Sequence, residues 1–177
     1  MIDARDLQAV FDDMGIRYFK ARRYLRLSKT GVVEELPDDF LPATKLVVQY
    51  ADALRELHGS AIICGNGYRP VDYNERVGSS KNSAHIRGAA MDLDPTRGHS
   101  DFALLCARAW LGTKRMHGLG VYNRRVHIDV DHDGSVGKRA WPRRWVPSSK
   151  LARLLRKAKK LGAIDLDAHI RGDSVVA

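Results

Sequence analysis

The sequence lacks long hydrophobic runs and has few cysteines. No apolar stretch approaches the roughly 20 residues needed to cross a bilayer, so no membrane-spanning segment is expected. The 2 cysteines, Cys64 and Cys106, each lie in an apolar stretch, where a free thiol packs as a small hydrophobic side chain. Disulfides are therefore not expected to hold this fold together.

A secretory leader is missing as well. Residues 1–19 are interrupted by acidic and basic side chains and contain no apolar stretch followed by a cleavage site of small residues. We expect a chain that is made in the cytoplasm without a signal peptide. Internal repeats and low-complexity segments are also absent from the sequence. A length of 177 residues with 44% hydrophobic content fits one domain spanning 1–177.

Basic side chains outnumber acidic ones. The formal net charge of +9 favours polyanionic partners such as cell-wall polymer, anionic lipid or nucleic acid. The basic residues gather in 143–160, and a helix is predicted over about 148–161. A solvated helix face is the first interpretation of this charge. Attraction to the cell wall or to lipid is the second, and nucleic acid is the least favoured partner.

The spacing of apolar residues predicts both helices and strands. Helical spacing is found at about 1–14, 44–58 and 100–110, and short β-prone segments are found at 60–64, 88–94 and 126–131. Residues 17–42 contain Gly31, Pro37 and Pro42 and are expected to wrap the core as loops and short pieces. The tail at 172–177 is expected to be flexible. Together these features predict an α+β domain.

Two of the predicted strands carry metal-binding side chains. In 88–94 the alternation puts Asp92 on the face opposite the apolar residues, and in 126–131 it does the same for His127 and Asp129. If the two strands are neighbours in one sheet, Asp92 and His127 can meet, and the loop before the first strand can supply His85. Two imidazoles and a carboxylate form an open zinc site with the fourth position left for water.

The neighbouring residues resemble the M15 family of zinc D-Ala-D-Ala peptidases, and most of all its branch found in phage lysins and bacterial endopeptidases. The resemblance covers about 60–145 and rests on Gly-Tyr-Arg-Pro at 67–70, Tyr-Asn at 73–74, Val-Gly at 77–78, Ser-Ala-His-Ile-Arg-Gly-Ala-Ala-Met-Asp at 83–92, Gly-Leu-Gly-Val-Tyr at 118–122 and Val-His-Ile-Asp at 126–129. It implies a small, mainly antiparallel sheet that carries the zinc site on its open face, with helices packed behind it and at its ends.

The resemblance also implies roles for individual residues. His85, Asp92 and His127 would hold one zinc ion per chain, and Arg69 would polarise the substrate carbonyl. These roles suit amide hydrolysis, which needs an activated water and a cation beside the developing oxyanion. A purely structural salt bridge is the alternative role for Arg69.

Two further residues belong to the implied substrate-binding set. Ser83 would help to hold a terminal or side-chain carboxylate of the substrate, and Tyr68, which precedes Arg69, is placed in the same set. A turn hydrogen bond is the alternative role for Ser83. These assignments come from the matching motif positions alone.

The sequence departs from the carboxypeptidase branch of the family at one position. Those enzymes carry an acidic general base three residues before the last zinc histidine, and Arg124 stands there in this chain. Asp129 is the best substitute, because it lies two residues beyond His127 on the same strand face. Its alternative role is to support a metal ligand through a hydrogen bond.

Other candidate sites carry less weight. The acidic residues of 129–134 copy the start of a calcium loop, but Ala140 stands where such a loop needs a bidentate Glu. The remaining histidines have no consistent ligand spacing and are interpreted as surface or structural residues, although His117 precedes the Gly-Leu-Gly motif and could line a cleft. These residues are His58, His99, His117, His132 and His169.

The sequence therefore predicts a zinc-dependent peptidase that cuts an amide in the stem peptides of bacterial peptidoglycan. We expect a phage endolysin or a virion-associated cell-wall peptidase. Its partner would be peptidoglycan, its place of action the cell wall, and virion components would be further partners. The alternative is a non-catalytic virion or structural protein in which zinc only stabilises the fold. An accessory module that binds nucleic acid through the basic helix is a third interpretation, which a steep salt dependence would reveal.

Overall fold

The computed structural model describes residues 1–131, 139–142 and 148–173. Its centre is a sheet with strand order β1-β2-β4-β3-β5, formed by β1 (Ile62–Asn66), β2 (Ala90–Pro95), β3 (Met116–Val121), β4 (Val126–Val130) and β5 (Arg139–Pro142). The neighbours β1 and β2, β2 and β4, and β4 and β3 are antiparallel, whereas β5 runs parallel to β3. The expected mainly antiparallel sheet is confirmed.

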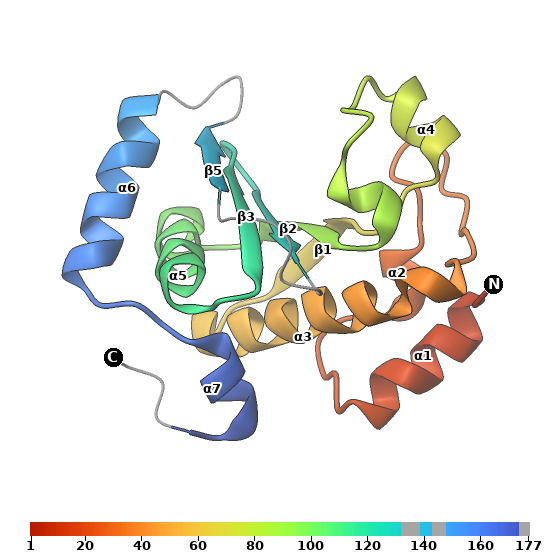
Figure 1. Ribbon diagram of the computed structural model, residues 1–177, viewed down its shortest axis with the longest axis horizontal. Coiled ribbons are helices and arrows are strands. Elements are labelled where there is room, and N and C mark those ends of the chain that lie inside the picture. The colour runs from red at the N-terminus through yellow and green to blue at the C-terminus, as the bar shows by residue number, and fades with distance from the viewer. Residues whose placement is uncertain (132–138, 143–147, 174–177) are drawn as a thin grey trace.

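Two long helices pack against this sheet. Helix α3 (Leu41–His58) contacts β2 and β4, and α5 (His99–Gly112) contacts β3 as well as β2 and β4. Figure 1 shows α3 running along one side of the sheet, with α5 and α6 beyond it toward the opposite end from α1. The apolar residues of β2 and β4 are fully buried in the core that these helices share. The helical layer therefore leaves the other sheet face to the polar residues.

The remaining helices are short or lie at the ends of the molecule. They are α1 (Ala4–Asp13), α2 (Ala21–Tyr24), η1 (Asp38–Phe40), α4 (Val71–Arg76), η2 (Ala84–Arg87), α6 (Ser148–Lys160) and α7 (Leu166–Arg171). None of the helices in the described part of the chain is long and apolar enough to span a membrane.

Local sequence signals explain where the predicted helices begin and end. Asp3 caps α1 by accepting hydrogen bonds from the backbone amides of Arg5 and Asp6. Helix α3 carries a proline in its first turn and ends at Gly59, whose φ of 73° lies in the left-handed region that favours glycine. Burial of one face of α3 against the sheet then stabilises the helix.

The segment expected to form loops and short pieces has a defined structure. Residues 25–34 fold back as a small hairpin, because Leu27 donates its backbone N–H to Val32 and Glu34 donates its backbone N–H to Leu25. An isolated bridge between Arg26 and Val33 continues this pairing. We call residues 28–31 the hairpin tip. The tip lies beside α4 and reaches the functional site described below.

Some elements were not predicted from the sequence. The Gly-Leu-Gly motif at 118–120 was interpreted as a turn, but it lies inside β3. Two glycines and a histidine weaken the strand signal of this segment, and pairing with β4 and β5 on its two sides outweighs that weak propensity. Helices α4 and α7 have only 6 residues each, too few for a periodic pattern to stand out.

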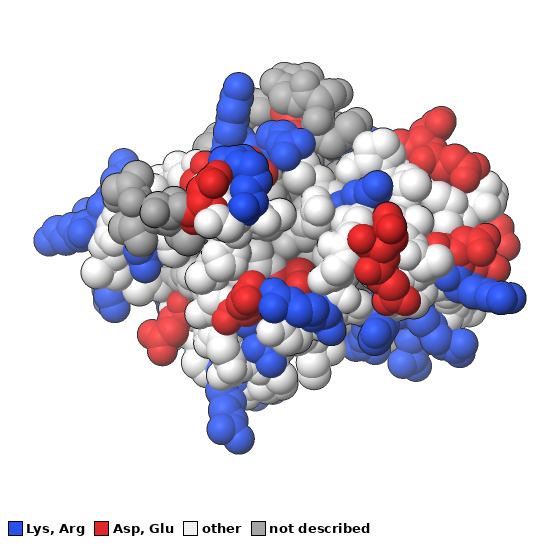
Figure 2. All heavy atoms as spheres, turned by 90° about the horizontal axis from the view of Figure 1, so that it is seen from below, with Lys and Arg blue, Asp and Glu red and all other residues white. Residues whose placement is uncertain are grey.

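Charged side chains are mixed on the surface. On the face shown in Figure 2, basic and acidic side chains are interspersed and do not form one continuous basic region. The basic helix α6 packs against α5 through an apolar side that includes the buried Leu151 and Ala158. Its many basic residues thus occupy the side that faces away from the core.

Candidate metal centre

The strand pairing brings the two predicted ligand strands together. In the antiparallel pair β2 and β4, Asp92 lies directly opposite His127, and Ala90 lies opposite Asp129. His85 comes from η2, the short helix just before β2. All three predicted ligands are buried, and one ligand atom from each lies within 4.8 Å of the other two. The expected meeting of Asp92 and His127 is therefore confirmed.

The distances between the donor atoms suit a single small cation. Nε2 of His85 lies 3.4 Å from Oδ1 of Asp92, and Nδ1 of His127 lies 3.0 Å from the same oxygen. Tetrahedral ligands at about 2.0–2.2 Å from a zinc ion are about 3.3–3.6 Å apart. The donor set, two imidazole nitrogens and one carboxylate oxygen, is also that of open zinc sites. The residues present thus fit zinc in chemistry; the 3.4 Å distance lies in the expected range, and the 3.0 Å distance is slightly shorter.

A backbone contact orients His85. Its Nδ1 lies 2.6 Å from the carbonyl oxygen of Gly67, so Nδ1 carries the proton and donates it to that oxygen. Nε2 is then left with a lone pair toward Asp92. The ring position also depends on Gly88, whose φ of 62° reverses the chain after η2. The carbonyl of Gly88 accepts hydrogen bonds from the buried hydroxyls of Tyr24 and Thr44.

Asp129 holds the other side of His127. Its Oδ2 lies 3.1 Å from Nε2 of His127, and its Oδ1 lies 2.9 Å from Nδ1 of His117. A carboxylate that accepts the N–H of a ligating imidazole fixes the tautomer and orientation of that ring. Nε2 of His117 is buried and makes no hydrogen bond with any described residue. The site therefore contains a continuous His117, Asp129 and His127 chain.

His117 is the main residue that the sequence did not assign. It was grouped with surface or structural histidines, but only 6% of it is exposed, and it contacts Asp129. Its place one residue before the Gly-Leu-Gly motif was the only available signal. The β-bulge between Met116 and Gly118 changes the register at this point, so simple alternation along the strand could not place the ring.

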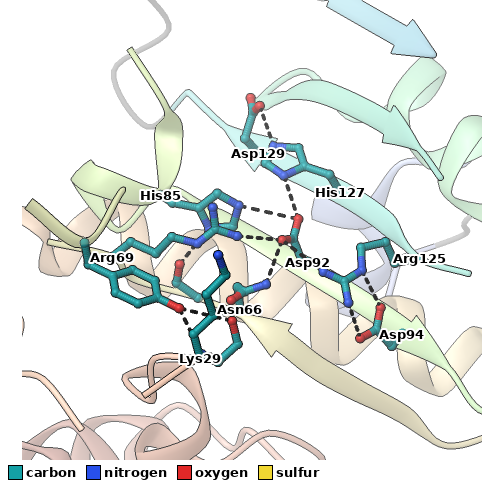
Figure 3. Close-up of polar contacts among 12 residues, drawn as sticks. Lys29, Asn66, Arg69, His85, Asp92, Asp94, Arg125, His127 and Asp129 are labelled. Carbon is teal, nitrogen blue, oxygen red and sulfur yellow. Dashed lines mark hydrogen bonds and ion pairs between the residues drawn. The ribbon is translucent and has the colours of Figure 1, made fainter. Parts of the chain in front are cut away.

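Asn66 and two arginines surround the second oxygen of Asp92. Oδ2 accepts hydrogen bonds from Nδ2 of Asn66 at 3.1 Å and from Arg69 at 2.9 Å, and Arg125 lies 3.8 Å away. Figure 3 shows these side chains converging on Asp92 from different strands and loops. Arg125 is also bound by Asp94, with N–O distances of 3.0 and 3.1 Å. Oδ1 of Asp92 is thereby directed at the histidines.

These contacts control the protonation of the site. Burial raises the pKa of Asp92, but the neighbouring His85 and His127 outweigh it, and the pKa lies well below its ordinary value. Burial also raises the pKa of Asp129, but the hydrogen bonds that it accepts from His127 and His117 outweigh burial, and its pKa is lowered. Burial lowers the pKa of His85. The two carboxylates are thus anionic and the His85 ring is neutral near pH 7, as metal binding requires. Burial opposes protonation of His127, but its hydrogen bonds with Asp129 and Asp92 outweigh burial and raise the pKa of that ring, so a metal ion has to displace a proton there.

The close approach of Asp129 explains why a glycine stands at position 118, the start of the Gly-Leu-Gly motif. Gly118 lies opposite Asp129 in the pairing of β3 with β4. A Cβ at this position would lie 2.1 Å from Oδ2 and 2.4 Å from Cγ of Asp129. Because Asp129 is held by two histidines, its carboxylate has little freedom to move aside. The lack of a side chain at Gly118 therefore creates the space that Asp129 occupies.

The candidate metal cluster borders a cleft of about 770 Å³. Asp92 and His127 line this cleft together with Asp129, Arg69 and Arg125, whereas His85 does not line it. One wall comes from α4 and the loop of residues 77–84, and the hairpin tip contributes Ser28 and Lys29. A substrate that enters this cleft would contact groups from four separate parts of the chain.

The predicted substrate-binding residues have different positions. Arg69 and Ser83 line the cleft, whereas Tyr68 is buried and does not line it. The Tyr68 ring packs against Phe40, with ring centroids 6.1 Å apart. Arg124, at the position of the missing acidic base, is exposed, and its neighbour Arg125 enters the site instead. The calcium-like segment and His132 lie largely or wholly outside the described residues.

A buried His, Asp and His cluster beside a cleft is the arrangement that metal-dependent hydrolases use. The comparison with known families gives the same class: a family model described as Peptidase M15 matches residues 22–131. The chain belongs to this peptidase family. The match includes the hairpin tip and every residue of the cluster, and it ends before α6. No curated protein matches the sequence.

Membership of this family supports a metallopeptidase that acts on peptidoglycan-like substrates.

Proposed function

We propose that this protein hydrolyses an amide bond in the stem peptides of bacterial peptidoglycan with one zinc ion per chain. The observation that carries the proposal is the buried cluster of His85, Asp92 and His127 beside a cleft that Asp92 and His127 line, in a chain of the M15 peptidase family. Zinc at this cluster would supply the Lewis acid that amide hydrolysis at neutral pH requires. The remaining chemistry is assigned to the side chains around it.

Arg69 is the proposed electrophilic residue. One guanidinium nitrogen binds Asp92 at 2.9 Å, and Nε makes no hydrogen bond with a described residue although it is buried. The guanidinium has five N–H donors, so the ion pair leaves donors for a substrate carbonyl. The same group can thus orient Asp92 and stabilise the oxyanion that forms when the amide is attacked. Ser83, on the cleft wall, is the proposed contact for a substrate carboxylate.

Asp129 is the proposed proton acceptor. It lines the cleft and its lowered pKa keeps it anionic at neutral pH. Its hydrogen bonds with His117 and His127 hold the carboxylate beside the candidate metal ligands. The same contacts support a second role, in which Asp129 orients His127 toward the metal. The two roles predict different measurements, which are developed in the Discussion.

The proposed place of action is the bacterial cell wall, reached after release from a producing cell or on a phage particle. The resemblance to the phage lysin branch supports this setting, and the net charge of +9 favours attraction to an anionic wall. The alternative is a non-catalytic virion or structural protein in which zinc only stabilises the fold. The cleft above the cluster argues for catalysis, because a structural zinc site is closed by a fourth protein ligand.

Digestion of purified peptidoglycan, followed by mass analysis of the fragments, tests the proposal and identifies the amide. We expect His85→Ala and His127→Ala to abolish both zinc binding and hydrolysis. His132→Ala serves as the matched control and should retain both. Intact peptidoglycan after treatment with the zinc-loaded protein would reject the enzymatic function, and equal losses in all three variants would reject the ligand assignment.

A further inference from the structure

Lys29 differs from the other basic residues of the cleft. Arg69 binds Asp92 and Arg125 binds Asp94, so the charges of both arginines are largely balanced. Lys29 also lines the cleft, but it makes no ion pair with a described residue. In the view of Figure 3, its side chain extends toward the side of the site occupied by Arg69 and Asn66. The cleft therefore contains a cation whose charge the described residues do not balance.

The position of Lys29 is fixed by the backbone. The backbone N–H of Lys29 donates to the hydroxyl oxygen of Tyr73 at 3.0 Å, and the Ser28 hydroxyl lies 3.3 Å from the same oxygen. Gly31 closes the tip by donating its N–H to the carbonyl of Leu27. Tyr73 belongs to α4, which forms the opposite part of the cleft wall. A residue fixed between two elements in this way presents its charge with a smaller loss of conformational entropy on binding.

The neighbouring wall is rich in small polar side chains. Ser28, Ser79, Ser80 and Asn82 line the same cleft, and their hydroxyl and amide groups can donate hydrogen bonds. An ammonium group surrounded by such donors is a suitable site for a carboxylate. A neutral carbonyl could accept a hydrogen bond from Lys29 but would not balance its charge, and a cationic group would be repelled.

We propose that Lys29 is a specificity-determining residue that binds a carboxylate of the peptide substrate at a distance from the scissile amide. The enzyme would thus select peptides that carry a free acidic group close to the bond that is cut and would discriminate against the same peptides with that group amidated. This inference rests on the proposed function and narrows its substrate class. Tyr73 acts as a positioning residue, because it anchors the tip that carries Lys29.

The test uses matched synthetic stem peptides that differ only in charge. One peptide carries a free carboxylate on its acidic residue, a second carries the amide there, and a third carries a C-terminal amide. For the zinc-loaded enzyme, kcat/KM for the acidic peptide divided by kcat/KM for each amidated peptide gives a discrimination ratio. The amidated peptide that shows the lower kcat/KM identifies which carboxylate Lys29 recognises.

We expect Lys29→Gln to reduce this ratio by about tenfold, the order expected for a charge-assisted contact. Lys29→Glu should invert the preference, and high salt should reduce the ratio in the parent enzyme because the cleft is open to solvent. Tyr73→Phe should lower the ratio to a smaller extent, because the tip loses its anchor. Lys81→Gln removes the same charge from an exposed neighbour that does not line the cleft, and it should leave the ratio unchanged.

Zinc content and melting temperature, measured on each variant, identify any loss that comes from misfolding. A discrimination ratio near one in the parent enzyme, or the same ratio in the parent and in Lys29→Gln and Lys29→Glu, would overturn the role of Lys29 while leaving the peptidase function intact. Failure of the parent enzyme to cut any of the three peptides or peptidoglycan would instead reject the proposed function itself.

Discussion

Replacement of Asp129 by Asn is the most informative single change in this protein. The variant keeps the shape of the side chain but replaces one acceptor oxygen by an NH₂ donor. In the parent structure, the two oxygens accept from Nδ1 of His117 and from Nε2 of His127. An amide can accept only one of these N–H groups through its oxygen, so one buried hydrogen bond must be lost.

The structure gives a magnitude for each role of Asp129. A lost hydrogen bond to a charged group costs about 1.5–3 kcal/mol, which corresponds to a factor of about 10–100 in an equilibrium constant. Zinc affinity should fall by about this factor if His127 loses its partner, as is usual for residues that orient a ligand. As a general base, Asp129 should in addition contribute about 10²–10⁴-fold to the rate.

We therefore expect Asp129→Asn to bind zinc more weakly and to hydrolyse a soluble stem peptide about 10²–10⁴-fold more slowly even when fully loaded with zinc. Zinc occupancy and turnover are measured on the same sample across a range of zinc concentrations. Asp101→Asn makes the same chemical change at an exposed position in the first turn of α5, outside the cleft, and serves as the control. A fully loaded Asp129→Asn variant that is nearly as fast as the parent would refute the base assignment and direct attention to Asp131 or His117.

Three further outcomes are expected. Removing zinc with a chelator should lower the melting temperature, and zinc at about 100 times its Kd should restore about 2.7 kcal/mol of stability, or roughly 5–10 °C for a domain of this size, as calorimetry would show. Gly118→Ala should destabilise the fold by about 1–3 kcal/mol in denaturant titration and reduce hydrolysis, because its Cβ would overlap the Asp129 carboxylate; unchanged activity would contradict this packing argument. Replacing Lys157, Lys159 and Lys160 by Gln should weaken binding to isolated cell walls at low salt and spare hydrolysis of a soluble peptide; loss of the soluble activity would place α6 in the catalytic site.

Much of the metal cluster was predictable because strand alternation is a local property. The period of two along β2 and β4 placed Asp92 and His127 opposite the apolar residues, and the structure pairs these two residues directly. Helix α3 was equally predictable from the sequence, since its apolar spacing and its terminal Gly59 are both local signals. Family motifs then provided the sheet topology and pointed to His85, which no periodicity could have selected.

The contacts that control the site required the tertiary structure. No local sequence signal predicts the contact between Asn66 and Asp92, because a β-bulge sets the pairing of these two residues. The contact between His117 and Asp129 is equally unpredictable, because a second bulge shifts the register of β3 at His117. Contacts of Ser28 and Lys29 with Tyr73 hold the hairpin tip at the cleft, and Lys29 and Tyr73 are 44 positions apart in the chain.

The sequence by itself thus determined the fold class, the main secondary structure and the three residues of the candidate metal cluster, because these follow from short-range periodicity and matching motifs. Only the tertiary structure decided which side chains orient those residues, which basic groups are already ion-paired and which one remains available to a substrate. Such properties depend on distances between segments far apart in the chain, and no pattern along the chain encodes those distances.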